Sequence, residues 1–504
     1  MTPPSAAIPP SPGGPPAGAG DPGLGGPTAR GASQTVIAQV GARLVSVIAV
    51  VGSTAIVVRH LGIEAYADWG TVVQLAALMA FAVDPGVSPI VVRRILQDPR
   101  TAPVPSALVP VRLALATLAF VVVVAVTVGL RGDGAVLLAA ALGAQVVPRA
   151  LVLNATPWLQ VDQRLHRQTA LEALAALLGL TMLGAAAAGG ASAAVLGLVG
   201  FTVPTALLAL LMRRELRITP SRALDVPGPQ RDRVQSVVSE VAPLAGALVL
   251  VAVYMRIYIV FVNEAEDEAT IGRFVFAFQF VDQLMVAAGI VAGAALPLLA
   301  VRATAQRLLR DHRTHDLVVA VTAVGALIGV AMIALATPIT DVVGGPEASG
   351  AERYLRLLAP IAPLLLASFV LAYVYVAIGQ SRRYLVFNAV GLVVNLAAHA
   401  LLTLSHGAEA AARITWGTEM VVTGLALAGI TLVASGRRAA AATATVVVVV
   451  AVASELAAAG TVAPLVAAGG AGLVTSVVAH RPLRWMADAV GVPLGPLAPE
   501  RPPG

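Results

Sequence analysis

The stretch Leu113-Ala-Leu-Ala-Thr-Leu-Ala-Phe-Val-Val-Val-Val-Ala-Val-Thr-Val128 contains no charged residue, and it decides the fold class. Similar apolar stretches recur along the chain, among them Leu317–Ala336 and Thr443–Ala459. A helix of about 20 apolar residues crosses the hydrocarbon core of a bilayer. Long continuous apolar runs favour helices over the alternating ten-residue strands of a membrane barrel. The sequence therefore predicts an all-α integral membrane protein.

The composition supports a membrane protein and argues against nucleic acid as a partner. Of the 504 residues, 58% are hydrophobic and 12% charged, and the mean hydropathy is +0.86. A soluble chain carries about 25% charged residues. The net charge of +6 comes from arginines spread over many short loops with few aromatics between them, which is unlike a nucleic-acid-binding face. Attraction to the anionic headgroups of membrane lipids explains this charge more simply.

The chain contains neither cysteine nor lysine, and all 33 of its basic residues are arginines. Disulfides, cysteine metal sites, a Walker A loop and a Schiff-base lysine are therefore excluded. The seven histidines are scattered and resemble no metal site. We expect a non-enzymatic transporter without a cofactor, driven by an ion gradient (H⁺ or Na⁺) or by consumption of its substrate.

Fourteen membrane spans are predicted, arranged as two six-helix lobes followed by two C-terminal helices. Glu64-Ala65-Tyr66 and Glu268-Ala269-Thr270 open similar spans 204 residues apart, which indicates parallel repeats. The spans are 34–58, 67–92, 106–129, 135–157, 168–188, 191–212, 236–262, 270–300, 317–340, 355–378, 384–404, 410–434, 439–459 and 461–480. The predicted parts are a disordered cytoplasmic tail (1–33), a first lobe (34–212), a cytoplasmic linker (213–235), a second lobe (236–434), the last two spans (435–481) and a cytoplasmic tail (482–504).

The arginines predict the orientation of these spans. The segments that share a side with the N-terminus hold 23 arginines, and the opposite segments hold five. Basic residues accumulate in cytoplasmic loops. We therefore expect a multi-pass protein of the cytoplasmic membrane with both termini in the cytoplasm. The five external arginines are Arg59, Arg131, Arg353, Arg356 and Arg413.

Short motifs in both halves carry a family resemblance. They are Arg59–Trp69 (Arg-His-Leu-Gly-Ile-Glu-Ala-Tyr-Ala-Asp-Trp), Asp84-Pro85-Gly86-Val87 with Arg93-Arg94, Tyr254–Ile259 with Ile271–Phe274, Leu296–Leu299, and Asn388 and Asn395 followed by Gly407–Ala411 and Glu419. Together they resemble the polysaccharide-export branch of the MATE/MOP flippase superfamily, over about residues 34–434. The chain departs from that pattern at Ala67, where the family often has Gly, and at Pro85, where it often has Leu.

The resemblance implies a monomeric secondary transporter that flips a polyprenyl-pyrophosphate-linked oligosaccharide by alternating access. Its expected partners are the lipid-linked glycan, membrane lipids, and glycan polymerase or assembly proteins. Related functions stay open, namely flipping of a lipid-linked peptidoglycan precursor or teichoic-acid unit, or MATE-type multidrug export. A membrane glycosyltransferase or ligase is disfavoured, because the gaps between spans are too short for an extramembrane catalytic domain.

Three arginines inside the spans are candidate substrate ligands. They are Arg43, Arg149 and Arg256. A cation inside the bilayer costs about 2.5–3.5 kcal/mol on insertion scales, so it needs a reason to be there. The arginine fork suits the oxygens of a pyrophosphate. The alternative is that these side chains extend back to the interface, as we expect for Arg112 and Arg273 near span ends.

Acidic and amide residues complete the candidate cavity. Asp84, Asp282 and Glu419 must face a cavity, pair with an arginine or hold a proton, because an isolated carboxylate in hydrocarbon is costly. Polar side chains also follow one face of two spans: Gln279, Asp282 and Gln283 on one, and Asn388 and Asn395 on the other. The alternative role for these side chains is hydrogen bonding between helices.

The sequence also places residues beside these candidates. His399 continues the face of Asn388 and Asn395 and is a weaker proton-relay candidate. Asp68 and Trp69 lie at the predicted external interface, where tryptophan commonly belongs to the aromatic belt.

Overall fold

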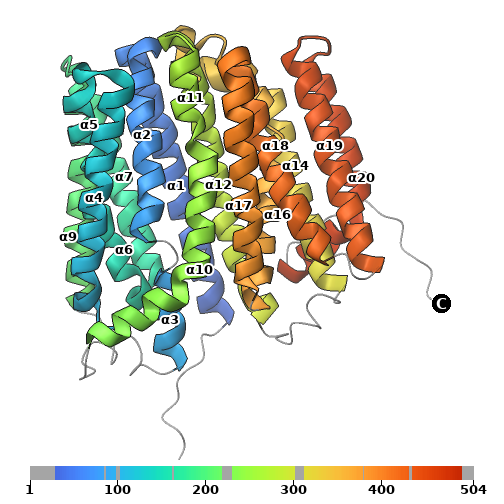
Figure 1. The fold of residues 1–504 in the computed structure, drawn as a ribbon, viewed down its shortest axis with the longest axis horizontal. Helices are drawn as coiled ribbons and strands as arrows, with labels where there is room; N and C mark the ends of the chain where they lie inside the picture. The colour runs from blue at the N-terminus through green and yellow to red at the C-terminus, as the bar shows by residue number, and fades with distance from the viewer. Residues whose placement is uncertain are drawn as a thin grey trace, which may run out of the picture.

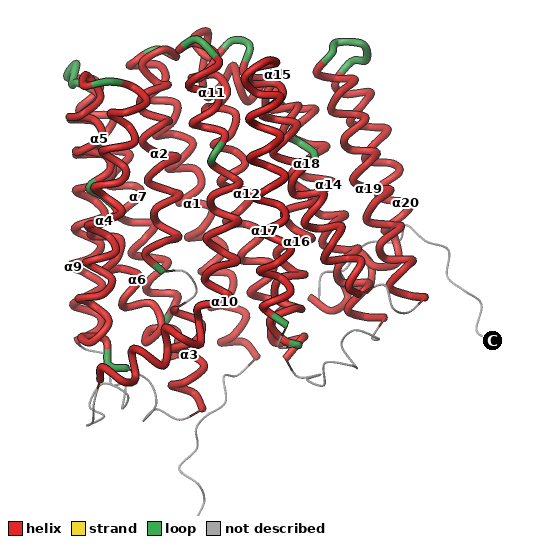
Figure 2. Tube along the Cα trace, in the orientation of Figure 1, coloured by secondary structure: helices red, strands yellow, loops and turns green. Residues whose placement is uncertain are grey.

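The computed structural model describes residues 29–84, 87–97, 103–161, 164–217, 230–300, 312–378, 380–430 and 434–490. Within these ranges every regular element is a helix and no strand is present (Figure 2). The long helices run roughly parallel as a single layered bundle (Figure 1). The all-α fold expected from the apolar spans is therefore confirmed.

The long helices of the first lobe run from one end of the bundle to the other (Figure 1). α1 lies against α7, α2 against α4, and α6 against α4 and α9. The elements are α1 (Ala29–Leu61), α2 (Ile63–Val83), α3 (Val87–Gln97), α4 (Pro105–Arg131), η2 (Asp133–Ala135), α5 (Val136–Gly143), α6 (Val146–Val161), α7 (Leu165–Ala188), α8 (Ala193–Gly197), η3 (Leu198–Thr202) and α9 (Val203–Arg217).

In the second lobe α10 lies against α17, and α16 lies against α12, α14 and α18; two more helices follow it. α19 and α20 pair with each other and pack against α14 at the right of Figure 1. The elements are α10 (Gln230–Arg256), α11 (Tyr258–Ala265), α12 (Glu268–Ala300), α14 (His312–Ile339), η5 (Thr340–Gly344), η6 (Gly345–Ala348), α15 (Ala351–Leu358), α16 (Ile361–Ala377), α17 (Ser381–Ala398), η7 (His399–Thr403), α18 (Leu404–Ile430), α19 (Ala434–Ala458) and α20 (Pro464–Val490).

Each of the fourteen predicted spans overlaps one or more of these helices. Among the described residues, eleven segments are long and apolar enough to cross a membrane. One of them, 381–429, contains two helices, because the chain reverses at Gly407 with φ 67°. The number of spans, and the side of the membrane on which each loop lies, stay predictions.

The structure moves two predicted boundaries. α20 continues through Pro482 to Val490, past the predicted start of the C-terminal tail, and membrane helices tolerate such a proline. The predicted linker 213–235 is helical at both ends, since α9 reaches Arg217 and α10 begins at Gln230. The remainder of that linker and most of both predicted tails lie outside the described residues.

The two lobes meet most closely where α2 lies against α12. A Cβ at Gly70 would come within 2.2 Å of Val275 Cγ1, and one at Gly272 within 2.0 Å of the Ile63 carbonyl oxygen. Only glycine permits this approach of two helix backbones. α12 also packs against α16, so this contact joins the first lobe to the core of the second.

Candidate functional site

A polar network crosses from the first lobe to the second in the interior of the bundle. The Asp282 carboxylate on α12 accepts hydrogen bonds from Gln74 Nε2 on α2 and from an Arg256 terminal nitrogen at the end of α10, each at 2.7 Å. Gln74 and Arg256 are both buried. Asp282 lies 14 residues beyond Glu268, which places it about 21 Å below that end of α12 at 1.5 Å per residue. The carboxylate therefore joins the lobes well inside the membrane.

A second set of bonds lies one helical turn away on α12. Tyr66 on α2 donates its hydroxyl hydrogen to Gln279 Oε1 at 2.7 Å, and Gln279 Nε2 donates to Thr54 Oγ1 on α1. We call these six residues the central network: Thr54, Tyr66, Gln74, Arg256, Gln279 and Asp282. Every member hydrogen-bonds across helices, and the network draws on four helices, α1 and α2 of the first lobe and α10 and α12 of the second.

The central network brings together three of the predicted site residues. Arg256 forms an ion pair with Asp282, with side chains 4% and 16% exposed, so its fork is engaged by a carboxylate in this conformation. Gln279 uses both ends of its amide. Gln283 is half-buried on α12, and no polar contact joins it to another described residue.

The sequence alone did not identify Thr54, Tyr66 and Gln74 as members of this network. A usable signal existed for Gln74, because an amide in an apolar span needs a partner. Gln74 Oε1 within the network and the hydroxyl of the neighbouring Tyr258 are buried and lack a hydrogen-bond partner among the described residues. Buried polar groups are nearly always satisfied by protein or by water. These two groups could therefore form hydrogen bonds with a polar ligand.

A cluster of basic residues lies among α1, α6 and α7 of the first lobe. Arg149 on α6 lies 3.5 Å from the carboxylate of Glu172 on α7, which also accepts a hydrogen bond from Gln168. Arg43 on α1 interacts electrostatically with both Glu172 and Arg149, and its buried Nε has no partner among the described residues. We call Arg43, Arg149 and Glu172 the basic cluster. The cluster contains two guanidinium groups and one carboxylate, of which Arg149 and Glu172 form the ion pair, so its charges sum to a net positive charge.

The basic cluster lies wholly within the first lobe, whereas the central network joins both lobes. Arg43 precedes Arg59, at the far end of α1, by 16 residues, which corresponds to about 24 Å. Arg149 is half-exposed, with 42% of its side chain accessible. Arg43 also lies 14 residues, about 21 Å, beyond Ala29, so the cluster stands near the middle of α1, at about the depth of Asp282 on α12.

The third intramembrane acid is buried inside the second lobe. Glu419 on α18 is 1% exposed and accepts a hydrogen bond of 2.7 Å from the Tyr254 hydroxyl. Asn388 on α17 lies 3.4 Å from the same hydroxyl, and Asn395 donates to Thr418 at 2.9 Å. Among the described residues, no arginine or histidine forms an ion pair with Glu419.

Asp84 forms a buried ion pair with Arg112. The prediction that Arg112 is an interfacial anchor is therefore wrong. Arg112 is 2% exposed rather than anchored at the interface, and it forms an ion pair of 3.2 Å with Asp84. Ser88 and Asn154 accept further hydrogen bonds from the same guanidinium, at 3.3 and 3.4 Å. This pair holds the end of α2 to α4 and α6.

We predict that Asp84→Asn lowers the stability of the protein by about 3–5 kcal/mol, because it leaves the Arg112 charge buried without a counter-ion. The measurement is equilibrium unfolding in detergent micelles. Asp133→Asn, at an exposed acid outside the helices of the core, is the matched control and should unfold like the parent. Equal stability of both variants would contradict the assigned pairing.

Trp69 and His399 are both buried in the structure. Trp69 is 3% exposed and packs edge-to-face on Phe201, so it is a core residue and not a belt residue. His399 is buried, stacks on Phe261, and has Nδ1 2.9 Å from Thr403 Oγ1. Among the described residues, no group of three or more acidic or histidine side chains could hold a metal ion.

Comparisons with known proteins agree with this architecture. The MatE family model matches residues 243–401, in the second lobe. No curated protein matches the sequence. Solved structures share the fold at low sequence identity. The lipid II flippase MurJ in an inward closed conformation matches with TM-score 0.61 and 10% identity, over 91% of this chain and 99% of that chain.

Two transporter structures match over a smaller part of the chain. An inward-facing multidrug resistance MATE family transporter of the MOP superfamily has TM-score 0.55 and 15% identity, over 81% of this chain and 99% of that chain. A MOP superfamily transporter from Pyrococcus furiosus has TM-score 0.52 and 16% identity, over 82% of this chain and 95% of that chain. With its two lobes of membrane helices and a MatE match in the second, the chain has the fold of the MATE/MOP superfamily of transporters.

Proposed function

We propose that the protein flips a polyprenyl-pyrophosphate-linked oligosaccharide across the cytoplasmic membrane by alternating access. The observation that carries the proposal is the basic cluster. Arg43 and Arg149 come from different helices, and Glu172, the ion-pair partner of Arg149, is the one carboxylate in the cluster, so the cluster keeps an excess positive charge in the first lobe. A pyrophosphate that leaves water needs such cations, and the arginine fork binds two of its oxygens at once.

The two polar sites divide the proposed work. The basic cluster, within the first lobe, receives the charged headgroup. The central network, between the lobes, offers hydroxyl and amide groups. Gln74 Oε1 in this network and the adjacent Tyr258 hydroxyl have no hydrogen-bond partner among the described residues, which suits the hydroxyls of a sugar. The lipid tail would remain in the bilayer while the lobes rock. We propose a monomer, working beside glycan polymerase or assembly proteins.

A lipid-linked peptidoglycan precursor is the second candidate substrate. The match to the lipid II flippase spans 91% of this chain. That extent cannot be reached without part of α19 or α20, because the residues before Ala434 are fewer, whereas the matches to the other two transporters need neither helix. Drug export is disfavoured, because an aromatic binding cavity is not expected in a chain with only 4% aromatic residues.

Arg43→Ala is expected to reduce flipping of a fluorescent polyprenyl-pyrophosphate glycan in proteoliposomes at least about tenfold. The reason is that a charge-assisted hydrogen bond contributes about 1.5–3 kcal/mol. Arg213→Ala, at an exposed arginine of α9, is the matched control and should flip at the parent rate. Comparing an oligosaccharide lipid with a peptidoglycan-precursor lipid and a cationic drug distinguishes the three substrates.

Two outcomes would overturn the proposal. One is parent-level flipping by Arg43→Ala, which would remove the basic cluster from the path. The other is transport of the drug without transport of either lipid. Size-exclusion profiles that match the parent establish that each variant is folded.

A further inference from the structure

Arg131 occupies a position that neither the proposed substrate path nor the predicted topology explains. It is the last residue of α4, at the face opposite to the start of α1, and one of the five arginines on the predicted external side. Its side chain is only 8% exposed. An arginine on the external side runs against the usual distribution of basic residues, so a specific set of contacts must hold it there.

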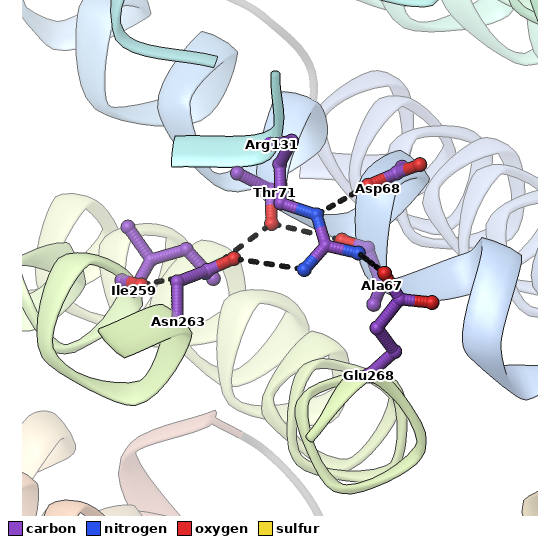
Figure 3. Close-up of polar contacts among 7 residues, drawn as sticks. All are labelled: Ala67, Asp68, Thr71, Arg131, Ile259, Asn263 and Glu268. Carbon is purple, nitrogen blue, oxygen red and sulfur yellow. Dashed lines mark hydrogen bonds and ion pairs between the residues drawn. The ribbon is translucent and has the colours of Figure 1, made fainter. Parts of the chain in front are cut away.

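Those contacts come from both lobes (Figure 3). From the first lobe, Asp68 on α2 forms an ion pair with Arg131 Nε. From the second lobe, Asn263 on α11 accepts from Arg131 at 3.4 Å, and Glu268, at the start of α12, forms an ion pair with it at 3.3 Å. Asn263 also donates to Thr71 of α2 at 3.5 Å. One guanidinium therefore ties α4 and α2 to α11 and α12.

The charges make this contact sensitive to the loss of Arg131. Two carboxylates from opposite lobes, Asp68 and Glu268, both touch a single cation. With the cation present, each lobe is attracted to it. With the cation removed, two like charges face each other across the lobe interface, and like charges at short range repel. The Arg131 guanidinium thus holds the lobes together and also neutralises the repulsion between Asp68 and Glu268.

The packing below these residues indicates what the contact protects. Val275 on α12 is 1% exposed and fills the space left by Gly70 on α2. It lies seven residues beyond Glu268, about 11 Å deeper along α12. This seam is uncharged and rests on the absence of side chains at Gly70 and Gly272. Separation of α2 from α12 would expose it to water.

We infer that Arg131 is an inter-lobe latch: its contacts with Asp68, Asn263 and Glu268 keep the external seam between α2 and α12 closed, and opening toward the outside requires their rupture. The latch concerns the separation of the lobes and is independent of the substrate, so it can be tested without any transport measurement.

The absence of cysteine from the chain permits a clean accessibility assay. Val275→Cys supplies one thiol in the seam, and intact cells are treated with a membrane-impermeant thiol reagent. In this background, Arg131→Met is expected to raise the labelling rate at least about tenfold, equal to about 1.4 kcal/mol. Arg131→Lys keeps the charge but loses the fork, so it should fall between the two.

Two controls separate the latch from general damage. Arg413→Met removes an external arginine of α18 whose ion pairs go to Glu409 and Glu455, within the second lobe and α19, and it should leave labelling at the Val275→Cys rate. Ala326→Cys places a thiol in the core of the second lobe, and it should stay unlabelled in the Arg131→Met background.

A triple variant tests the repulsion between the two carboxylates. Adding Asp68→Asn and Glu268→Gln to Arg131→Met removes the repulsion, so labelling should fall below that of Arg131→Met alone. The inference is overturned if Arg131→Met labels at the Val275→Cys rate. It is equally overturned if Arg413→Met accelerates labelling to the same extent, or if the Ala326→Cys thiol becomes reactive together with the seam.

Discussion

Asp282→Asn is expected to lower the initial rate of flipping at least about hundredfold. The Asp282 carboxylate is the counter-ion of Arg256, which is 3% exposed, and it also accepts the hydrogen bond from Gln74 of the opposite lobe. Removing one partner of a buried ion pair costs about 3–5 kcal/mol, because the remaining charge has no water to solvate it. In this protein the loss falls at the point where the two lobes are joined.

A double-variant cycle with Arg256→Gln provides the measurement. If the pair acts as a unit, Asp282→Asn combined with Arg256→Gln should be more stable than either single variant, since no unpaired charge remains. Flipping should stay low, because the contact between the lobes is altered. Asp341→Asn, at an exposed acid of η5, serves as the control. Additive effects of the two substitutions would exclude the coupling, and parent-level flipping by Asp282→Asn would exclude the role.

Glu419→Gln is expected to abolish the response of transport to a proton gradient. We propose that Glu419 exchanges the coupling proton. Its carboxyl group is buried and accepts a hydrogen bond of 2.7 Å from the Tyr254 hydroxyl, and an ionised carboxylate without a cation is costly in such a place. Glutamine keeps the size of the side chain and its hydrogen-bonding oxygen, but it cannot bind or release a proton.

The test is flipping in proteoliposomes under an imposed pH gradient, and separately under a sodium gradient. The parent should accelerate with the pH gradient, and Glu419→Gln should run at one rate with or without it. Glu455→Gln, at a surface ion pair with Arg413, is the control and should respond like the parent. A parent driven by sodium alone, or a Glu419→Gln variant that still responds to the pH gradient, would refute the assignment.

The fold could be predicted because it follows from local properties of the chain. Runs such as Leu113–Val128 must be helical in a bilayer whatever their neighbours are, since every backbone group has to be satisfied within the segment. A proline does not by itself fix the end of a membrane helix. Pro482 resembles the beginning of a tail, yet the helix continues through it to Val490.

The site was only partly predictable, because its contacts depend on how helices are rotated against each other. Arg43 and Arg149 were each recognised as cations inside spans, but nothing local indicates that both approach Glu172. Arg112 and Trp69 lie near span ends, which suggested the interface, and only tertiary packing buries them.

The external arginines carried a signal that the orientation argument did not use. All five are bound: Arg59 donates to the Val342 carbonyl, Arg353 and Arg413 pair with acids, Arg356 donates to Thr337, and Arg131 forms the latch. Each exception to the basic-residue rule thus marks a tertiary contact. A sequence reader can list such exceptions and expect a partner for each.

The short turn between α11 and α12 has a mechanical consequence. Glu266 accepts a hydrogen bond of 2.7 Å from the Ala408 amide, where the chain reverses at Gly407 into α18. Asp267 accepts one from the Thr270 amide, which lowers the pKa of its carboxyl group and fixes the first turn of α12. Glu268 holds Arg131. Three consecutive acids therefore bind α18, the first turn of α12 and α4. An outward displacement of Glu268 would also move Ala408 through Glu266, and with it the part of α18 that carries Glu419 eleven residues further along.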